Sequence, residues 1–328
     1  MKFEGFIGNQ RIKEQLVSLL ETGRFPHALI IEGEEGLGKK TLAREIALSL
    51  VCSSNEERPC RQCSACNKAL KGVHPDIIEK SNTEGKRSFS IETVRDIISD
   101  AYVTPNEAQY KVYILDNCHL MGIPAQNALL KIIEEPPEYA VFILCTPTKS
   151  AFLQTVLSRC VAITLEGVDY QEGAQYISER DSSLDIDEIR QAIALCNGNI
   201  GKTLEMLGEG KLSRIIDIAN DIALSSICSN EYELIKACSV FERDNQTLIS
   251  ALTFLKGILR DAMLFGSGAG LISNQTESAK QLSSVLTKGK LIKMIEVCDS
   301  IISFANGNGN NALLITKLCY ELRRAQNR

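Results

Sequence analysis

The sequence predicts an α/β domain built on a parallel sheet, followed by a region that is entirely helical. Short apolar runs alternate with helical periodicity over about the first 165 residues, and from Asp169 onward only helical periodicity remains. A Gly-rich segment, GEEGLGKKT at residues 33–41, also joins one apolar run directly to a helical pattern. Strands that alternate with helices are typical of a parallel sheet covered by helices.

Five short segments are expected to form the strands of this sheet: residues 28–32, 74–80, 111–115, 140–148 and 161–165. Three of them, 28–32, 111–115 and 140–148, are apolar and rich in β-forming residues, which suits strands that are buried on both faces.

Helices are expected between these strands. Asn9 and Ser90 are candidate N-caps, since each precedes a stretch with an apolar face. A helix over residues 125–134 should end before Pro136, because proline cannot continue a helix. A short helix from Ser150 leads to LSRC at 157–160, and residues 84–88 are expected to form an exposed polar loop.

The second half of the chain is predicted to be helical throughout. Helices at about 169–180, 185–196 and 200–208 suggest a small three-helix domain, and a longer helical region follows. Breaks are expected near Ser229 and in the Gly- and Asn-rich segments 266–270 and 306–311. An apolar stripe formed by Leu291, Ile295, Cys298 and Ile302 indicates a packing surface. The expected division is 1–166, 167–209 and 210–328.

Charge and composition make a protein partner a better expectation than nucleic acid alone. The formal net charge is −5, and residues 1–165 carry 19 Lys and Arg against 20 Asp and Glu. Residues 166–328 carry 17 against 21, so neither half has the basic excess of a protein that holds nucleic acid by itself. No run has membrane-spanning length and the start has no signal-peptide pattern, so the cytoplasm is the expected location.

Residues 33–41 match a phosphate-binding loop except at one position. Gly33, Gly36, Gly38 and Lys39 fit the pattern G-x-x-x-x-G-K in the strand-loop-helix context that such a loop requires. The next position should be Ser or Thr to ligate Mg²⁺, and it is Lys40, with Thr41 one residue late. One residue turns a side chain by about 100° around a helix, so the Thr41 hydroxyl would point away from the metal. Nucleotide binding therefore stays open.

The strand at 111–115 ends in Asp116, where a nucleotide-hydrolysing protein carries an Asp for Mg²⁺. A Glu that activates water often follows, but here the residue is Asn117, whose amide cannot accept a proton at neutral pH. The pattern keeps the metal-side carboxylate and lacks the base.

Four of the twelve cysteines are clustered and predict a metal site. The spacing Cys60-x-x-Cys63-x-x-Cys66, with Cys52 before it, is typical of a closed, structural four-thiolate Zn²⁺ site in a module at about residues 52–73. An iron–sulfur cluster would use the same ligands. His74 is expected to pack or cap rather than to replace a cysteine. The other eight cysteines are expected to act as small core hydrophobes.

These features together resemble the AAA+ subunits of the bacterial DNA polymerase III clamp loader. The resemblance rests on FPHALIIEG-EEGLGKK, the four-cysteine insertion after the loop helix, QNALLKIIEEPP and LSRC, in that order. It implies an AAA+ domain with a zinc insertion, a helical lid and an all-helical collar that forms the oligomer. The match is good over the α/β domain and weak beyond it.

Two subunit types of that assembly are similar, gamma/tau and delta prime. The first hydrolyses ATP with GK[ST] and Asp-Glu, and this sequence departs from both motifs at Lys40 and Asn117. Lys202 stands about where an ATP-using subunit carries a sensing Arg. These departures are of the delta-prime kind, so the resemblance implies a subunit that does not turn over ATP.

The resemblance assigns Arg159 of LSRC as an arginine finger that reaches the nucleotide site of a neighbouring gamma/tau subunit. A finger supplied in trans is worth ~10³–10⁵ in rate in related enzymes. The implied partners are the gamma/tau and delta subunits and, through the complex, the sliding clamp and primed DNA. A lone Arg more commonly pairs with a surface carboxylate.

Two alternatives compete with this interpretation. One is an active gamma/tau-like ATPase that uses Lys39, Thr41 and Asp116. The other is a zinc-dependent DNA-binding module, although its basic residues are offset by nearby glutamates. No set of carboxylates for two-metal nucleotidyl transfer is present, so polymerase activity is not expected.

Overall fold

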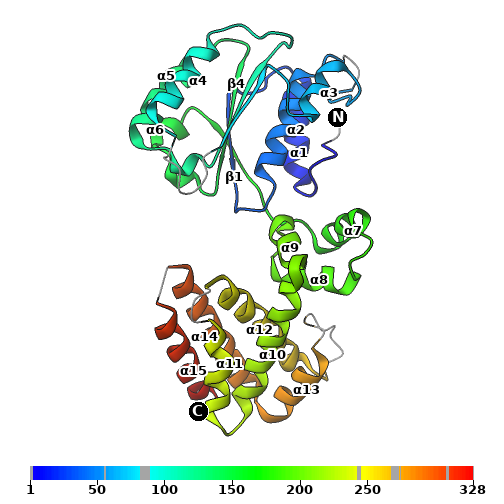
Figure 1. The fold of residues 1–328 in the computed structure, drawn as a ribbon, viewed down its shortest axis with the longest axis vertical. Coiled ribbons are helices and arrows are strands. Elements are labelled where there is room, and N and C mark those ends of the chain that lie inside the picture. The colour runs from blue at the N-terminus through cyan, green and yellow to red at the C-terminus, as the bar shows by residue number, and fades with distance from the viewer. Residues whose placement is uncertain are drawn as a thin grey trace. The chain divides into compact units, whose positions relative to one another are not determined.

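The computed structural model describes residues 3–54, 57–81, 89–241, 245–266, 273, 275–307 and 310–327. Contacts divide the chain into two compact units (Figure 1). The first unit combines Met1–Tyr176 with Gly198–Lys202, and the second combines Ile177–Asn197 with Thr203–Arg328. The expected three-part division at residues 166 and 209 stays a prediction.

The first unit contains the predicted five-stranded parallel sheet, with strand order β2-β3-β4-β1-β5. The strands are β1 (Ala28–Glu32), β2 (Ile77–Ser81), β3 (Lys111–Asp116), β4 (Ala140–Thr146) and β5 (Val161–Thr164). Because all strands run the same way, their carboxyl ends lie at one edge of the sheet. Pairing there brings Glu32 opposite both Thr146 and Thr164, and Ser81 opposite Asp116.

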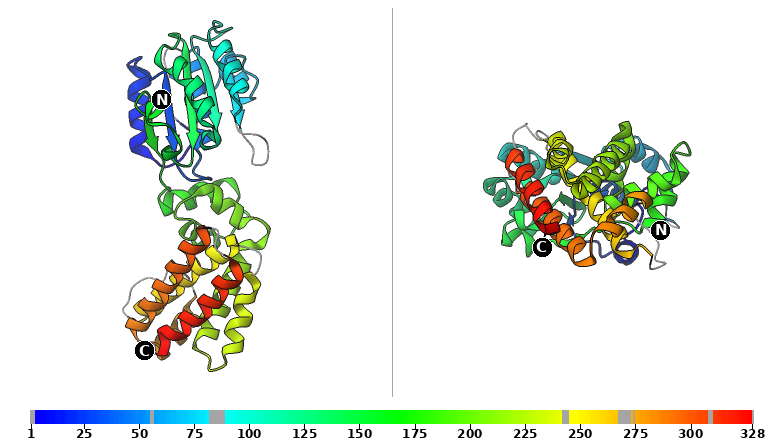
Figure 2. Two further views of the ribbon diagram at one scale, coloured as in Figure 1. Left: turned by 90° about the vertical axis from the view of Figure 1, so that its left-hand side faces the viewer. Right: turned by 90° about the horizontal axis from the view of Figure 1, so that it is seen from below.

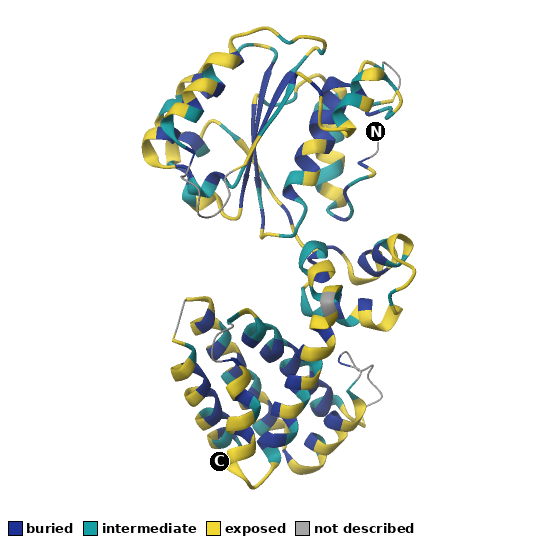
Figure 3. Cartoon of the chain, in the orientation of Figure 1, coloured by how far each residue is buried: buried dark blue, intermediate teal, exposed yellow. Residues whose placement is uncertain are grey.

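Helices cover both faces of this sheet (Figure 1). One face packs against α1 (Gln10–Glu21) and α2 (Lys39–Val51), and the other against α4 (Ile91–Ala101), α5 (Ile123–Glu134) and α6 (Gln154–Leu157). Successive strand side chains point to opposite faces, so Leu29 and Ile31 join the first apolar cluster and Ala28 and Ile30 the second. The inner strands β1, β3 and β4 are buried almost throughout, which explains why they are continuous apolar runs, whereas the edge strands β2 and β5 are partly or mostly exposed (Figure 3).

One of the two predicted caps is confirmed and the other is wrong. The Ser90 side chain accepts a hydrogen bond from the Thr93 N–H and begins α4. Asn9 precedes α1 but has a left-handed backbone and makes no capping hydrogen bond with its side chain. Its side-chain amide instead forms two hydrogen bonds with the backbone of Glu166. This tertiary contact outweighs the local cap.

Short elements complete this part of the chain. They are α3 (Ser64–Leu70), the 3₁₀ turns η1 (Cys118–Leu120) and η2 (Lys149–Ala151), and α7 (Tyr170–Arg180), at which the two units meet in sequence. The α5 helix ends at Glu134, as the prolines predicted.

The described residues of the second unit form helices joined by turns and form no strand, as predicted. Its elements are α8 (Ile186–Leu195), α9 (Ile200–Leu207), η3 (Gly208–Gly210), α10 (Lys211–Ile227), α11 (Glu231–Cys238), η4 (Ser239–Phe241), α12 (Asn245–Leu264), α13 (Thr276–Val285), α14 (Lys288–Asn306) and α15 (Asn311–Asn327). The long helices share one apolar core, and α14 and α15 run side by side (Figure 2). The predicted stripe packs there: Leu291 and Cys298 are buried, and Ile295 and Ile302 are partly buried. The predicted breaks near Ser229 and at 306–311 separate helices, whereas 84–88 and most of 266–270 lie outside the described residues.

The scattered cysteines only partly follow the prediction that they are core residues. Five of these eight are buried: Cys118, Cys145, Cys238, Cys298 and Cys319. Cys160 and Cys196 are half-buried, and Cys228 is exposed just after α10 ends. For Cys228 the prediction is wrong, because a helix end places it at the surface.

Candidate functional site

The glycine-rich loop joins β1 to α2 at the carboxyl edge of the sheet. Gly36 and Gly38 have φ angles of 89° and 81°, which side chains rarely adopt. Gly38 is the N-cap of α2, so the first N–H groups of this helix face the loop. The first turn of α2 therefore presents backbone N–H groups to the loop, and phosphate binding there stays a prediction.

Lys39 lies inside this loop and binds its backbone. The Lys39 ammonium donates to the carbonyl of Gly33 at 2.7 Å and to that of Glu34 at 2.8 Å. Burial lowers the pKa of Lys39, although the charges of acidic neighbours, Asp116 among them, oppose that shift. Lys39 and Asp116 are thus brought to the same edge of the sheet, as expected for a nucleotide site.

Lys40 points to β2. Its Nζ lies 3.5 Å from Glu79 Oε2, and the same carboxylate receives two hydrogen bonds from Arg44 at 2.6 and 2.7 Å. Arg44 lowers the pKa of Glu79 by donating these hydrogen bonds, and Lys40 adds to the effect. Thr41 is exposed. The position that would ligate Mg²⁺ therefore holds an ammonium group paired with a carboxylate.

Asp116 at the end of β3 is engaged by protein groups on both oxygens. Oδ1 accepts from the Asn117 N–H at 3.0 Å and Oδ2 from the Ser81 hydroxyl at 3.2 Å. Asn117 has a φ of 58° and is the N-cap of η1.

A second carboxylate at this edge is Glu32, which no sequence motif had indicated. It accepts from the Lys149 N–H and the Thr164 hydroxyl, and these bonds outweigh burial and lower its pKa. Its position directly before Gly33 is the sequence feature that could have indicated this residue.

The segment 198–202 lies directly on the loop, which sequence spacing alone did not reveal. The Asn199 amide donates to the Glu35 carbonyl at 2.7 Å, and the Gly201 N–H donates to the Gly36 carbonyl at 3.0 Å. Lys202, the residue at the expected sensing position, forms an ion pair with Glu34 at 2.7 Å. A Cβ on Gly36 would lie 2.3 Å from Asn199 Oδ1, so this contact requires glycine. The segment 198–202 therefore holds the glycine-rich loop through the backbone carbonyls of Glu35 and Gly36.

The four predicted metal ligands converge at the other end of α2. The Sγ atoms of Cys52, Cys60, Cys63 and Cys66 lie within 4.8 Å of one another. A tetrahedral Zn²⁺ with Zn–S bonds of about 2.3 Å holds its sulfurs roughly 3.8 Å apart, so the set fits a single ion. His74 lies outside this cluster, and its Nδ1 accepts from the Asp76 N–H, as its predicted capping role requires.

Backbone N–H groups surround these sulfurs. The Cys60 N–H points to Cys52 Sγ, the Cys63 N–H to Cys60 Sγ and the Cys66 N–H to Cys63 Sγ, each at 3.4 Å. Burial raises the pKa of Cys63, but hydrogen bonds from Ser53 and Cys66 outweigh it and give a pKa of about 6. Such donors stabilise thiolates, which is the form that binds a metal. The four sulfurs therefore fit a divalent ion whose positive charge would neutralise the thiolates. Such an ion would hold the module together without taking part in chemistry.

Arg159 lies away from the loop, between α6 and β5. Its Nε is 2.8 Å from Glu134 Oε1 on α5, and its Nη1 donates to the Thr155 carbonyl and the Ser158 hydroxyl. The side chain is 40% exposed. The structure thus contains the surface ion pair that is the common role of a lone arginine, and the guanidinium remains accessible.

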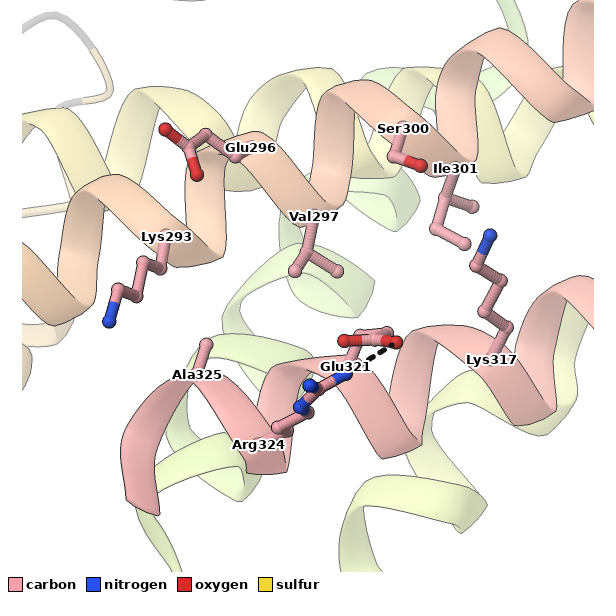
Figure 4. Close-up of a pocket in the computed structure, with 9 residues that line it drawn as sticks. All are labelled: Lys293, Glu296, Val297, Ser300, Ile301, Lys317, Glu321, Arg324 and Ala325. Atoms are coloured by element: carbon pink, nitrogen blue, oxygen red, sulfur yellow. Dashed lines mark ion pairs between the residues drawn. The ribbon is translucent and has the colours of Figure 1, made fainter. Parts of the chain in front are cut away.

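A groove of about 420 Å³ lies between α14 and α15, apart from all of these residues. Figure 4 shows Val297 and Ile301 pointing from α14 toward α15, where Glu321 and Arg324 form an ion pair. Its lining mixes both charges with short apolar side chains, so it has no group placed for chemistry.

The chain is similar to known subunits of DNA polymerase III. A family model described as DNA polymerase III, delta subunit, matches residues 8–169. DNA polymerase III subunit gamma of Buchnera aphidicola subsp. Acyrthosiphon pisum is 30% identical over 268 residues, which cover 78% of this chain and 72% of that protein. Subunit tau of Bacillus subtilis is 26% identical over 90% of this chain and 57% of its own length. A gamma subunit-related protein of Thermotoga maritima has a TM-score of 0.42 at 21% identity, with 96% and 100% of the two chains covered.

The chain has a parallel, five-stranded α/β sheet covered by helices, with a glycine-rich loop between β1 and α2. It belongs to the family of DNA polymerase III clamp-loader subunits. Among the described residues, no helix is long and apolar enough to cross a membrane.

Proposed function

We propose that this chain is a clamp-loader subunit of the delta-prime kind, which does not hydrolyse ATP itself. The observation that carries the proposal is the geometry at Lys40. An ammonium group paired with Glu79 occupies the position of a metal-ligating hydroxyl, and Thr41 is exposed. Asn117 supports the same conclusion, because an amide cannot serve as a general base. A nucleotide bound at Gly33, Gly36, Gly38, Lys39, Thr41 and Asp116 would lack the hydroxyl ligand of Mg²⁺ and the general base, although Asp116 keeps the metal-side carboxylate.

The active role that we propose for the chain is to supply Arg159 to a neighbouring gamma/tau subunit. The Arg159 guanidinium is 40% exposed and its partner Glu134 is 46% exposed. Exposed ion pairs contribute only about 0–1 kcal/mol, so Arg159 can leave Glu134 at little cost. The proposed partners are gamma/tau and delta in a ring that places the sliding clamp on primed DNA, in the cytoplasm where bacterial replication takes place. The lid and collar roles of residues 167–209 and 210–328 belong to this proposal.

The arginine proposal is tested in the assembled complex. Arg159→Ala should lower ATP turnover by the neighbouring site by roughly 10³-fold or more, as for a lost arginine finger. Arg190→Ala is the control, since Arg190 is an exposed arginine paired only with Asp187 on its own helix. Equal turnover of the two variants in complexes of equal composition would overturn the assignment.

A second candidate is an active gamma/tau-like ATPase, and the names of the similar proteins favour it over delta prime. The curated relatives that cover most of this chain are named gamma or tau. The loop residues favour the first candidate, and the relatives favour the second. Turnover by the purified chain separates them, because only the second requires Lys39 of this chain to act on ATP.

The metal site is proposed to hold one structural Zn²⁺ on Cys52, Cys60, Cys63 and Cys66. The convergence of the four sulfurs supports it. A closed four-thiolate set leaves no position for a reacting water, so the ion would stabilise the module without taking part in chemistry.

A further inference from the structure

Arg61 has an unusual backbone conformation inside the metal-binding loop. It lies between Cys60 and Cys63 and has a φ of 56°, a conformation that costs a residue with a side chain about 1–2 kcal/mol. Such strain persists only where the surroundings hold the residue in place. At Arg61 the surroundings are the two cysteines on either side and an acidic partner outside the loop.

That partner is Glu45, in the middle of α2. Arg61 Nη2 lies 2.7 Å from Glu45 Oε1 and 2.6 Å from Oε2. The Glu45 side chain is only 9% exposed and that of Arg61 is 23% exposed, so this is a largely buried ion pair. A buried carboxylate that loses its cation is strongly unfavourable, unlike an exposed one. Glu45 therefore depends on Arg61.

The N-terminal segment 3–8 lies over this ion pair. Arg61 Nε is 3.3 Å from Glu4 Oε2, and a Cβ on Gly5 would lie 2.4 Å from Glu45 Oε1. Phe6 is buried, and its ring lies 3.2 Å from the position of a Cβ on Gly38, the N-cap of α2. One short segment thus contacts the Arg61–Glu45 pair at one end and the phosphate loop at the other.

We propose that the Arg61–Glu45 pair couples the metal site to the phosphate loop. A metal ion bound by Cys60 and Cys63 fixes the backbone between them and so holds the Arg61 guanidinium against Glu45. Without the ion, the backbone between Cys60 and Cys63 is no longer fixed, and Glu45 loses its ion pair with Arg61. The segment 3–8 then packs less firmly on Glu45 and Gly38. Metal occupancy thereby controls the order of the loop at 33–38 from the far end of α2.

The same module offers a matched control. Lys68 on α3 pairs with Glu107 at 2.6 Å, but these side chains are 38% and 44% exposed. An exposed pair is screened by water and contributes little. Glu107→Gln therefore removes an ion pair between the module and the rest of the unit without leaving a buried charge. Glu45→Gln removes the charge of the buried pair while keeping the size of the side chain.

Hydrogen exchange of the full chain tests the coupling, with and without Zn²⁺ and with the metal content measured. The informative amides are Phe6 and Gly8 in the N-terminal segment and Leu37 in the loop, since each N–H is hydrogen-bonded. In the wild type, removal of the metal should speed their exchange at least about tenfold, which equals about 1.4 kcal/mol. Glu45→Gln should show the faster exchange even when loaded with metal, whereas Glu107→Gln should match the wild type.

Unchanged exchange at these amides after metal removal from the wild type would overturn the proposal. Equal effects of Glu45→Gln and Glu107→Gln would also overturn it. If Glu45→Gln does not fold, Arg61→Lys takes its place, because lysine keeps the charge but loses the two-point contact.

A double-mutant cycle separates this role from general stabilisation. The free energy of unfolding is compared among the wild type, Glu45→Gln, Arg61→Gln and the double variant, in both metal states. The coupling between the two residues should be present in the loaded protein and lost in the stripped one. Equal coupling in both states would show that the pair forms without the metal and would contradict the proposal.

Discussion

Among single residues, two carboxylates near the carboxyl edge of the sheet accept hydrogen bonds or ion pairs from other residues of the chain. Lys40 and Arg44 neutralise Glu79, and Ser81 and Asn117 donate to Asp116. At a hydrolytic site the residue at position 40 and Asp116 would face Mg²⁺. Here Lys40 pairs with Glu79 instead, and both oxygens of Asp116 accept hydrogen bonds from protein groups.

Asp76 gives a testable pH dependence at this scale. It is fully buried, and its carboxylate accepts hydrogen bonds from the N–H groups of Asn106, Glu107 and Ala108 and from the Asn106 amide. Burial alone would raise the pKa of Asp76, but these hydrogen bonds outweigh it and lower the pKa. A carboxyl group with a lowered pKa stabilises the fold above its unfolded value of about 3.9, and the contribution is lost as the pH falls through the folded value.

We therefore expect Asp76→Asn to lower the free energy of unfolding at pH 7 by roughly 1.5–3 kcal/mol, because its amide faces N–H donors. The difference from the wild type should shrink below about pH 4. Denaturant titrations between pH 7 and pH 3 measure it. A difference that stays constant across this range would contradict the role of the ionised carboxylate.

At the scale of elements, α2 connects the parts of the candidate site. It begins at the glycine-rich loop, contacts Arg61 through Glu45 at its middle, and is followed by Cys52, one of the four clustered cysteines. Its sheet-facing side is buried among the strands β1, β3 and β4. Full burial contributes about 1.5–3 kcal/mol for a large apolar side chain, so α2 is a rigid support.

The contact of segment 198–202 with the loop predicts a specific effect of a glycine substitution. Gly36→Ala introduces a Cβ only 2.3 Å from Asn199 Oδ1 at a φ of 89°. Gly23→Ala is the matched control, since Gly23 has a φ of 66° and no atom within 4 Å of the added Cβ. The control should lose about 1–2 kcal/mol from backbone strain alone, and Gly36→Ala should lose clearly more. Equal losses in denaturant unfolding would show that the segment does not rest on the loop.

The metal module predicts a defined stoichiometry. Native mass spectrometry of the full chain should show one metal ion, and Cys63→Ser with Cys66→Ser should remove it, because two thiolates cannot form a closed site. Replacement of Cys228, an exposed cysteine outside the cluster, is the control and should leave the metal in place. Retention of the ion by the double variant would refute the ligand assignment.

At the scale of the whole molecule, the sequence predicted the strands well and the contacts between distant segments poorly. The boundaries of β1 were predicted to the residue, because a short apolar run ended by glycine has few alternatives. The convergence of the four cysteine sulfurs and the strand-loop-helix order at residues 28–51 could also be expected, since their spacing is local. Asn9 binding to Glu166 and Asn199 binding to the loop join residues about 160 positions apart, which no local pattern records.

The family of the chain and the details of its loop lead to different expectations about its activity. Its relatives are named gamma and tau, whereas Lys40 and Asn117 remove two groups on which hydrolysis depends. An exposed arginine can still act on a neighbouring subunit when the chain's own site is inactive. The proposed function therefore requires no turnover at the loop of this chain.

Steady-state ATP hydrolysis by the purified chain shows whether the loop of this chain turns over ATP. The wild type is compared with Lys39→Ala, which removes the ammonium group inside the loop. We expect no turnover above background for either protein, because the hydroxyl that would ligate Mg²⁺ and the general base are both missing. Turnover by the wild type that Lys39→Ala abolishes would contradict it and identify the chain as an active ATPase.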